Sequence, residues 1–246
     1  MQKILYIFVL SFILISCGDT SNNRTNSLST LIKPSFTYNI DFFRCNLNDN
    51  VSLFNLESFF SKNILKYSTL IEFENIKLSV LFPDNESNVK NFLLSITSKG
   101  NPAFLKKFID EINADGIDEI ADCSFAIYQN NAFDIIPKET TNSDFNKIEI
   151  LRCTYNDSYN YGTFKISIDR FVNHIQKLDI PYSLSYVEDK SLKNSFFWIN
   201  TFYQKQYKDS LLASWVTNRD SIEIKDEFTE NATCLDSSVY KSYDLL

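Results

Sequence analysis

The chain contains one short motif twice, and this repetition limits the folds that it can adopt. Residues 43–49, Phe-Arg-Cys-Asn-Leu-Asn-Asp, match residues 151–157, Leu-Arg-Cys-Thr-Tyr-Asn-Asp, at four of seven positions. Alternating apolar residues precede each copy, and the Asn-Asp pair is typical of a turn. A sequence that repeats a whole unit folds into units of one design. We therefore expect a tandem duplication, with one copy over 36–137, a polar linker over 138–147 and a second copy over 148–246.

The residues around each motif predict an α+β protein made of two strand-strand-helix-strand-helix-hairpin units. Apolar residues three and four apart favour helices, and apolar residues at every second position favour strands. In the first copy we expect a strand near Val51–Phe54, a helix capped by Asn55, a strand over Ile76–Phe82, helices over Val89–Ile96 and from Asn101-Pro102, and a hairpin turning near Asn130-Asn131. In the second copy we expect a strand near Thr163–Ile166, a helix capped by Ser167, a strand over Tyr182–Tyr186, a long helix over Leu192–Tyr203, and a hairpin turning near Asn218–Asp220.

The first sixteen residues have the layout of an export signal. Lys3 precedes an apolar run over Ile4–Ile15, which is too short to span a bilayer. The run ends in Leu14-Ile15-Ser16-Cys17, and in this setting that motif resembles the lipobox of bacterial lipoproteins. The resemblance covers the leader alone, and no family is recognised for the body. It implies that the leader, residues 1–16, is removed and that acyl chains such as palmitate are attached to Cys17.

Residues 17–35 are small and polar after the lipidated cysteine, so we expect them to form a flexible tether. The resemblance implies a cell-envelope protein held on the lipid bilayer through Cys17. Gly18 stands where some lipoproteins carry an inner-membrane retention signal, so the outer membrane is the expected location. The sequence leaves open whether the body faces the periplasm or the cell surface.

Composition excludes several function classes. The formal net charge of −7 disfavours nucleic-acid binding, which needs basic residues to displace phosphate counterions. Four glycines leave no phosphate-cradling loop, and a single histidine, His174, rules out multi-histidine metal centres. We therefore expect no cofactor and no metal site.

With Cys17 assigned to lipid, four cysteines remain: Cys45, Cys123, Cys153 and Cys234. An even number in an exported protein permits two disulfides, with three possible connectivities. The alternative is four buried free thiols, because an unpaired cysteine packs like a small apolar residue. The sequence does not decide between them.

Four sets of residues are candidates for a site. Tyr155, Tyr159 and Tyr161 crowd a polar segment and form a possible ligand surface, although cross-strand aromatics also serve stability alone. Arg44 with Asp49, and Arg152 with Asp157, recur in both copies, and ordinary surface pairing is the simpler interpretation. The acidic stretch over 111–122 partly resembles a calcium loop, but a helix ending at a left-handed Gly116 explains it better.

The fourth candidate is His174, which lies beside the apolar stripe of a predicted helix and has no evident catalytic partner. These observations favour a non-catalytic envelope lipoprotein that binds another envelope protein, as a scaffold or in an immunity-type role. The alternatives are a lipoprotein that binds a glycan or small ligand, and a hydrolase using His174. An enzyme is the less favoured class.

Overall fold

The computed structural model describes residues 33–70, 73–84, 89–138, 146–178, 180–203 and 217–246, together with residues 209, 211, 213 and 215. Phe36–Leu246 form one compact unit. The leader, Cys17, most of the tether and residues 139–145 of the expected linker lie outside the described residues. Among the helices that are described, none is long and apolar enough to cross a membrane.

Both halves of this unit follow one order of elements: strand, helix, strand, strand, helix, strand. The first half consists of β1 (Tyr38–Leu47), α2 (Leu53–Thr69), β2 (Ile76–Pro83), β3 (Asn91–Ser98), α3 (Pro102–Ala114), the short α4 (Ile117–Ile120), β4 (Ala121–Cys123) and β5 (Asn130–Ile136). The second half consists of β6 (Asn146–Tyr155), α5 (Tyr161–Gln176), β7 (Tyr182–Glu188), β8 (Ser195–Phe202), α7 (Arg219–Asn231) and β9 (Ala232–Asp244). The α+β class and the duplication are confirmed, but each unit has the ferredoxin-like order rather than the expected one.

The strands form one antiparallel sheet, which closes on itself. Their order is β3-β2-β9-β6-β8-β7-β5-β1-β4, and β1 also pairs with β3. Within each half the first strand lies between the third and the last, so β1 and β6 hold equivalent places. The halves join where β2 pairs with β9 and where β5 pairs with β7.

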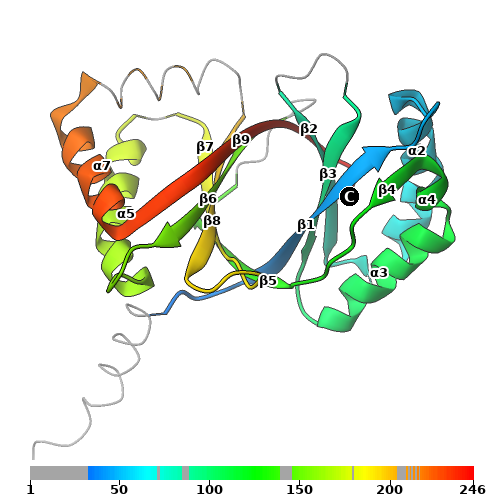
Figure 1. Ribbon diagram of the computed structural model, residues 1–246, viewed down its shortest axis with the longest axis horizontal. Coiled ribbons are helices and arrows are strands. Elements are labelled where there is room, and N and C mark those ends of the chain that lie inside the picture. Colours follow the sequence, from blue (N-terminus) through cyan, green and yellow to red (C-terminus); the bar gives the residue numbers. More distant parts are fainter. Residues whose placement is uncertain are drawn as a thin grey trace, which may run out of the picture. The chain divides into compact units, whose positions relative to one another are not determined.

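The closed sheet separates three hydrophobic cores. Helices α2, α3 and α4 cover the outer face of the first half, and α5 and α7 cover that of the second (Figure 1). Phe43 of β1 and Phe196 of β8 point outward into these two cores. A smaller core fills the interior and includes Ile40 of β1 and Ile199 of β8. Because side chains alternate along a strand, each central strand contributes to an outer core and to the interior.

Two disulfides occupy matching positions in the two halves. Cys45 is joined to Cys123 between β1 and β4, and Cys153 is joined to Cys234 between β6 and β9. Of the three possible connectivities, the structure therefore has the one in which each disulfide joins two cysteines of the same half.

Two expected helices are strands, and both are the third strand of their half. The segment Val89–Ile96 lies largely in β3, and Leu192–Tyr203 contains β8. Both faces of these strands are buried, one under helices and one toward the interior. A strand buried on both faces loses its alternating pattern, and its apolar run then resembles a helix.

The expected strands at Val51–Phe54 and Thr163–Ile166 lie in or at the start of helices. α2 begins after Ser52 and α5 after Asn160, each with a capping box, so Asn55 and Ser167 are not the caps. Phe54 and Ile166 suggested strands, but they are 73% and 66% exposed on the outer faces of these helices.

Neither expected hairpin turn forms. Asn130 and Asn131 begin β5, and β4 and β5 both pair with β1 instead of with each other. Asn218 caps α7, accepting a hydrogen bond from the backbone N–H of Asp220, and β9 follows as one long strand. Asparagine serves turns and helix caps equally well, so the residue type alone did not distinguish them.

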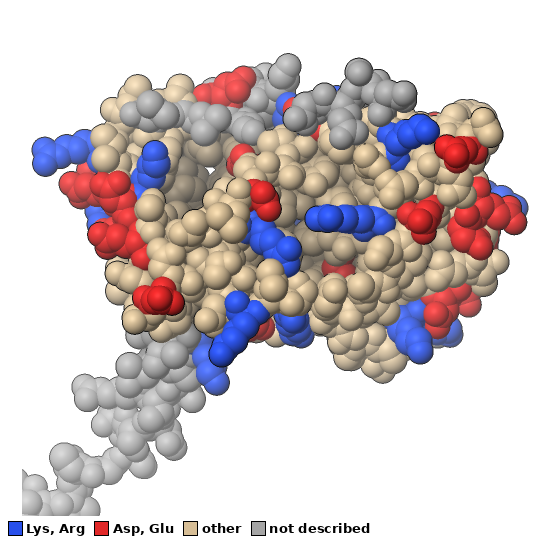
Figure 2. All heavy atoms as spheres, in the orientation of Figure 1, with Lys and Arg blue, Asp and Glu red and all other residues tan. Residues whose placement is uncertain are grey.

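Charge is unevenly spread over the face shown in Figure 2. Lys and Arg lie both across the middle, over the closed sheet, and at the two ends, while acidic side chains gather mostly toward the two ends, over the helices.

Candidate functional site

A cavity of about 480 Å³ lies between the outer face of the second-half sheet and the helices that cover it. Its lining comes from β6, β7, β8, β9, α5 and α7, and from residues 211 and 215. We call it the second-half cavity. Its volume is within the range of cavities that hold small molecules.

Seven of the residues that line the second-half cavity are aromatic. Trp198 of β8 is at the centre, with ring centroids 5.7 Å from both Phe164 and Phe171 of α5. Phe228 of α7 and Trp215 extend the wall, at 5.4 Å from Trp198 and 5.1 Å from Phe171 respectively. Most of these pairs are tilted or edge-to-face, as aromatic quadrupoles prefer. The wall therefore offers ring faces and edges to a flat apolar molecule.

A chain of hydrogen bonds crosses the sheet side of the cavity. The hydroxyl of Tyr182 donates to Oδ1 of Asn200 at 2.7 Å, and Nδ2 of Asn200 donates to Oε2 of Glu149 at 2.8 Å. Burial raises the pKa of Tyr182 well above its usual value, and the nearby charge of Glu149 raises it further. The phenol therefore stays protonated and remains a donor at all physiological pH values.

The cavity reaches the surface at the junction of α7 and β9. Lys225 and Thr229 of α7 and Thr233 and Cys234 of β9 line it and are exposed. Among the described residues of the rim, Lys225 is the one cationic side chain, and it lies above a mostly apolar interior.

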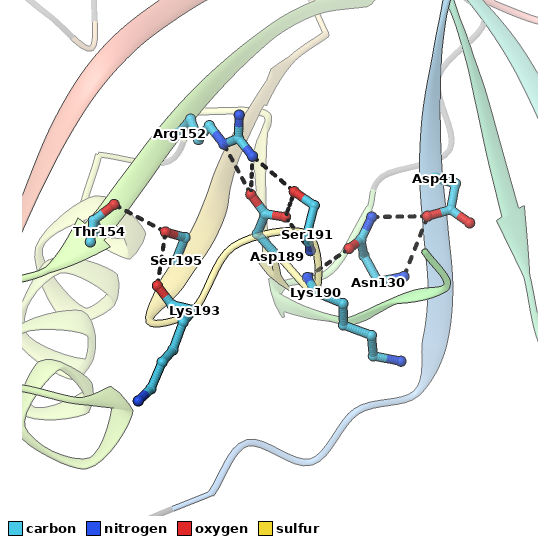
Figure 3. Close-up of polar contacts among 9 residues, drawn as sticks. All are labelled: Asp41, Asn130, Arg152, Thr154, Asp189, Lys190, Ser191, Lys193 and Ser195. Atoms are coloured by element: carbon cyan, nitrogen blue, oxygen red, sulfur yellow. Dashed lines mark hydrogen bonds and ion pairs between the residues drawn. The ribbon is translucent and has the colours of Figure 1, made fainter. Parts of the chain in front are cut away.

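A second polar cluster, drawn in Figure 3, joins the two halves. Arg152 of β6 donates through Nε and Nη2 to Oδ2 of Asp189, at 2.9 and 2.7 Å. The backbone N–H of Lys190 donates to Oδ1 of Asn130, whose Nδ2 donates to Asp41 of β1 at 2.9 Å. Asp189 and Asp41 are 2% and 1% exposed. Both carboxylate oxygens of each of these two side chains accept a hydrogen bond. This saturation indicates a structural role, because no acceptor is left pointing at a ligand site.

Arg152 therefore does not pair with Asp157, and Asp49 pairs with Lys90 instead of with Arg44. The recurring Arg and Asp residues are not two matched ligand sites.

The acidic stretch over 111–122 is also structural. Gly116 has a φ of +91°, and Asp115 accepts hydrogen bonds from Lys66 and Tyr67. Within the described ranges, no group of acidic, histidine and cysteine side chains could hold a metal ion.

The three tyrosines do not share one exposed surface. Tyr155 lies 4.7 Å from Phe196 and exchanges a hydrogen bond with the hydroxyl of Tyr186. Burial raises the pKa of Tyr155, so its phenol stays neutral. Tyr161 packs against Tyr186 and Phe133, and only Tyr159 is exposed.

His174 is buried between α5 and α7. Its Nε2 lies 3.2 Å from the hydroxyl of Ser221, and its ring packs edge-on against Trp215. A hydroxyl is thus within reach, but both residues are buried and neither lines the second-half cavity. This pair does not give a substrate access to a nucleophile, so the hydrolase alternative has no site here.

Sequence reasoning missed the second-half cavity because its wall comes from elements far apart in the chain. One local signal was present. Read as a strand, residues 196–202 put Phe196, Trp198 and Phe202 on one face together with the polar Asn200. An amide among aromatic neighbours indicates a polar point in an apolar wall.

Comparison with known proteins shows similarity at the level of structure only. No protein-family model and no curated protein matches the chain. The structure of a protein from Fusobacterium nucleatum assigned as a monooxygenase aligns with a TM-score of 0.60 and 7% identity, over 86% of this chain and 94% of that one. A chlorite dismutase variant from Candidatus Nitrospira defluvii aligns with a TM-score of 0.55 and 6% identity, over 89% and 96% of the two chains.

A further protein, from Lactobacillus acidophilus and also assigned as a monooxygenase, aligns with a TM-score of 0.53 and 10% identity, over 85% and 95% of the chains. At these identities the likeness shows the fold alone. That fold is one that enzymes use. The expectation of a non-catalytic protein with a scaffold or immunity-type role is therefore corrected, because the similar structures carry enzyme assignments.

Proposed function

We propose that this protein holds a flat, largely apolar organic molecule in the second-half cavity and carries out oxidative chemistry on it. The observation that carries the proposal is the aromatic wall around a space of about 480 Å³. A two- or three-ring molecule suits such a space, because ring edges and faces on several sides hold it in one plane.

Lys225 gives the expected ligand a polar end. Its ammonium lies at the rim, where a carboxylate on the ligand would pair with it while the rings stay in the cavity. An aromatic carboxylate therefore matches the wall and the rim together.

The oxidative part of the proposal draws on the similar structures. Monooxygenase and chlorite dismutase are names of redox enzymes, and these structures have TM-scores above 0.5. Redox enzymes commonly rely on a cofactor for the difficult step.

The residues that line the second-half cavity do not fit a haem iron as they stand. Haem iron takes a histidine, cysteine, methionine or tyrosine ligand. Of these types the described lining holds Tyr182, which is committed to Asn200, and Cys234, which is in a disulfide. His174 does not line the cavity and bonds Ser221. We therefore assign the cavity to an organic substrate and not to haem.

Tryptophan fluorescence tests the binding. The chain has two tryptophans, and both line the cavity, so a ligand there changes the whole tryptophan signal. Titration with 2-naphthoate should give a saturable change. Lys225→Met should weaken naphthoate binding about threefold to tenfold, as expected for one exposed charge pair, and should leave neutral 2-naphthamide unaffected.

Lys193→Met is the matched control, because Lys193 is exposed and does not line the cavity. Equal weakening by both variants, or no saturable signal in the unmodified protein, contradicts the cavity assignment.

Oxygen uptake with a dihydroxynaphthoate tests the reaction. Oxidation of this hydroquinone by O₂ gives the quinone and hydrogen peroxide. Uptake should exceed the rate in buffer and fall in Thr229→Trp, which places a large ring at the rim. Binding without extra oxygen uptake would contradict the oxidative part and leave the binding part standing.

We also propose that Cys17 is acylated and anchors the protein in the cell envelope. The leader layout and the lipobox support this proposal. The intact mass of the mature protein should equal that of a chain that begins at Cys17 and carries acyl chains. Cys17→Ser should abolish both the removal of the leader and the added acyl mass. An unacylated mature protein contradicts the anchor.

A further inference from the structure

The Cys153–Cys234 disulfide lies at the rim of the second-half cavity. Cys234 is exposed and lines the cavity, whereas Cys153 is 1% exposed and belongs to the second-half core. The matching disulfide of the first half, Cys45–Cys123, does not line the cavity. The chain thus holds two disulfides in equivalent positions, of which one borders the cavity.

The start of β9 is attached to the sheet along one edge, through its pairing with β6 and through side-chain hydrogen bonds of Thr233 and Ser237. Its register with β6 shifts between Arg152 and Cys153. Leu235 therefore has no pairing partner in β6, and its side chain projects into solvent. All residues over Thr233–Ser238 are exposed. β2 pairs with β9 only from Tyr240 to Asp244, so among the described strands Thr233–Ser238 is paired along one edge. A bulged strand held on one edge opens more easily than one held on two.

The start of β9 is directly connected to the wall of the cavity. α7 ends at Asn231 and β9 begins at Ala232, with no loop between them. Phe228 and Thr229, in the last turn of α7, line the cavity together with Thr233. Movement of the start of β9 therefore moves the side of the cavity that carries the opening.

We infer that the Cys153–Cys234 disulfide is a redox switch that holds the second-half cavity in its ligand-binding shape. The inference rests on the proposed function. In the oxidised protein the disulfide fastens the start of β9 to β6. After reduction the bulged segment opens, the α7 end of the wall loosens and the bound molecule leaves faster.

The reductant required is a dithiol. Its thiolate attacks the accessible sulfur of Cys234, and Cys153 leaves as a thiolate that takes up a proton. The second thiol of the reductant then releases Cys234 as a thiol, and the reductant becomes a disulfide. Two electrons and two protons pass to the protein. Cys123 is half-buried against the first-half core, so limiting reductant should open Cys153–Cys234 first.

The test compares two matched double variants in the full chain. Cys153→Ala with Cys234→Ser removes the switch, and Cys45→Ala with Cys123→Ser removes its first-half counterpart. The first should raise the Kd for 2-naphthoate by on the order of tenfold, mainly through faster dissociation, and the second should change it little. Treating the unmodified protein with limiting dithiol should raise the Kd in the same way as the first variant. Alkylation and mass spectrometry report which cysteines are reduced.

Amide hydrogen exchange gives a second measurement that needs no ligand and no substitution. Reduction should speed exchange over Thr233–Ser238 and over the last turn of α7. Unchanged exchange there, or faster exchange with an unchanged Kd, overturns the switch. Absent naphthoate binding in the oxidised protein would instead contradict the proposed function, and unchanged exchange would still overturn the switch.

Discussion

Side chains that the sequence places close together often find their partners elsewhere. Arg152 was expected to pair with Asp157, five residues on, but its partner Asp189 lies 37 residues away on the turn after β7. Lys66 and Tyr67 meet Asp115 across a gap of almost fifty residues. Local spacing predicted that Gly116 would be left-handed, because that depends on the backbone alone. It could not predict ion pairs that depend on the packing of two helices.

Asp115 gives a prediction of pH-dependent stability. Partial burial raises the pKa of this carboxyl, but hydrogen bonds from Lys66 and Tyr67 outweigh it and lower the pKa below its usual value. A carboxyl with a lowered folded pKa contributes stability above its unfolded pKa and loses that contribution as pH falls through the folded value.

Asp115→Asn should therefore cost about 1 kcal/mol or less at pH 7, and the cost should shrink at pH 3. Urea unfolding at both pH values measures this difference. Asp226→Asn, at an exposed carboxylate on α7, is the control. A cost that is the same at both pH values would show that the contacts of Asp115 do not favour its charged form.

At the scale of elements, the pattern predicted the strands and helices whose apolar residues keep a regular spacing. Both faces of β7 are buried, but Ser183 and Ser185 on one face preserve its alternation. β2 and β7 were predicted from alternation, and α3 was predicted from Asn101-Pro102 and its apolar stripe. β3 and β8 were missed because apolar residues occupy both of their buried faces, which only the closed sheet explains. The starts of α2 and α5 were missed because exposed apolar residues in their first two turns made these segments resemble strands.

The capping box of α5 gives a prediction at this scale. The side chain of Asn160 accepts a hydrogen bond from the backbone N–H of Gly162, and Thr163 reaches back to the backbone N–H of Asn160. Asn160→Ala should lower the free energy of unfolding by about 1 kcal/mol.

Asn173→Ala, at an exposed position inside the same helix, should instead be neutral or slightly stabilising, because alanine is the better helix former. Thermal or urea unfolding of the two variants compares them directly. Equal losses would show that Asn160 is not the cap.

At the scale of the whole molecule, the sequence predicted the duplication but not the way that the two copies combine. The repeated Arg-Cys motif marks β1 and β6, the equivalent strands of the two halves. Nothing local indicates that β2 pairs with β9 and β5 with β7, although these two pairings close the sheet. The second-half cavity depends on the same assembly, since six elements line it.

The two halves have come to differ within this common plan. Among the described residues, those that line the aromatic cavity all belong to the second half, and Cys153–Cys234 reaches its rim whereas Cys45–Cys123 does not line it. One half thus lines the candidate site, and the other completes the closed sheet that supports it.

A crystal structure of the protein with 6-bromo-2-naphthoate tests the central claim most directly, because the anomalous signal of bromine locates the ligand without ambiguity. We predict one bromine peak inside the second-half cavity, with the ring system against Trp198 and the carboxylate near Lys225. A peak elsewhere on the protein, with the second-half cavity empty, would contradict the assignment of this cavity as the functional site.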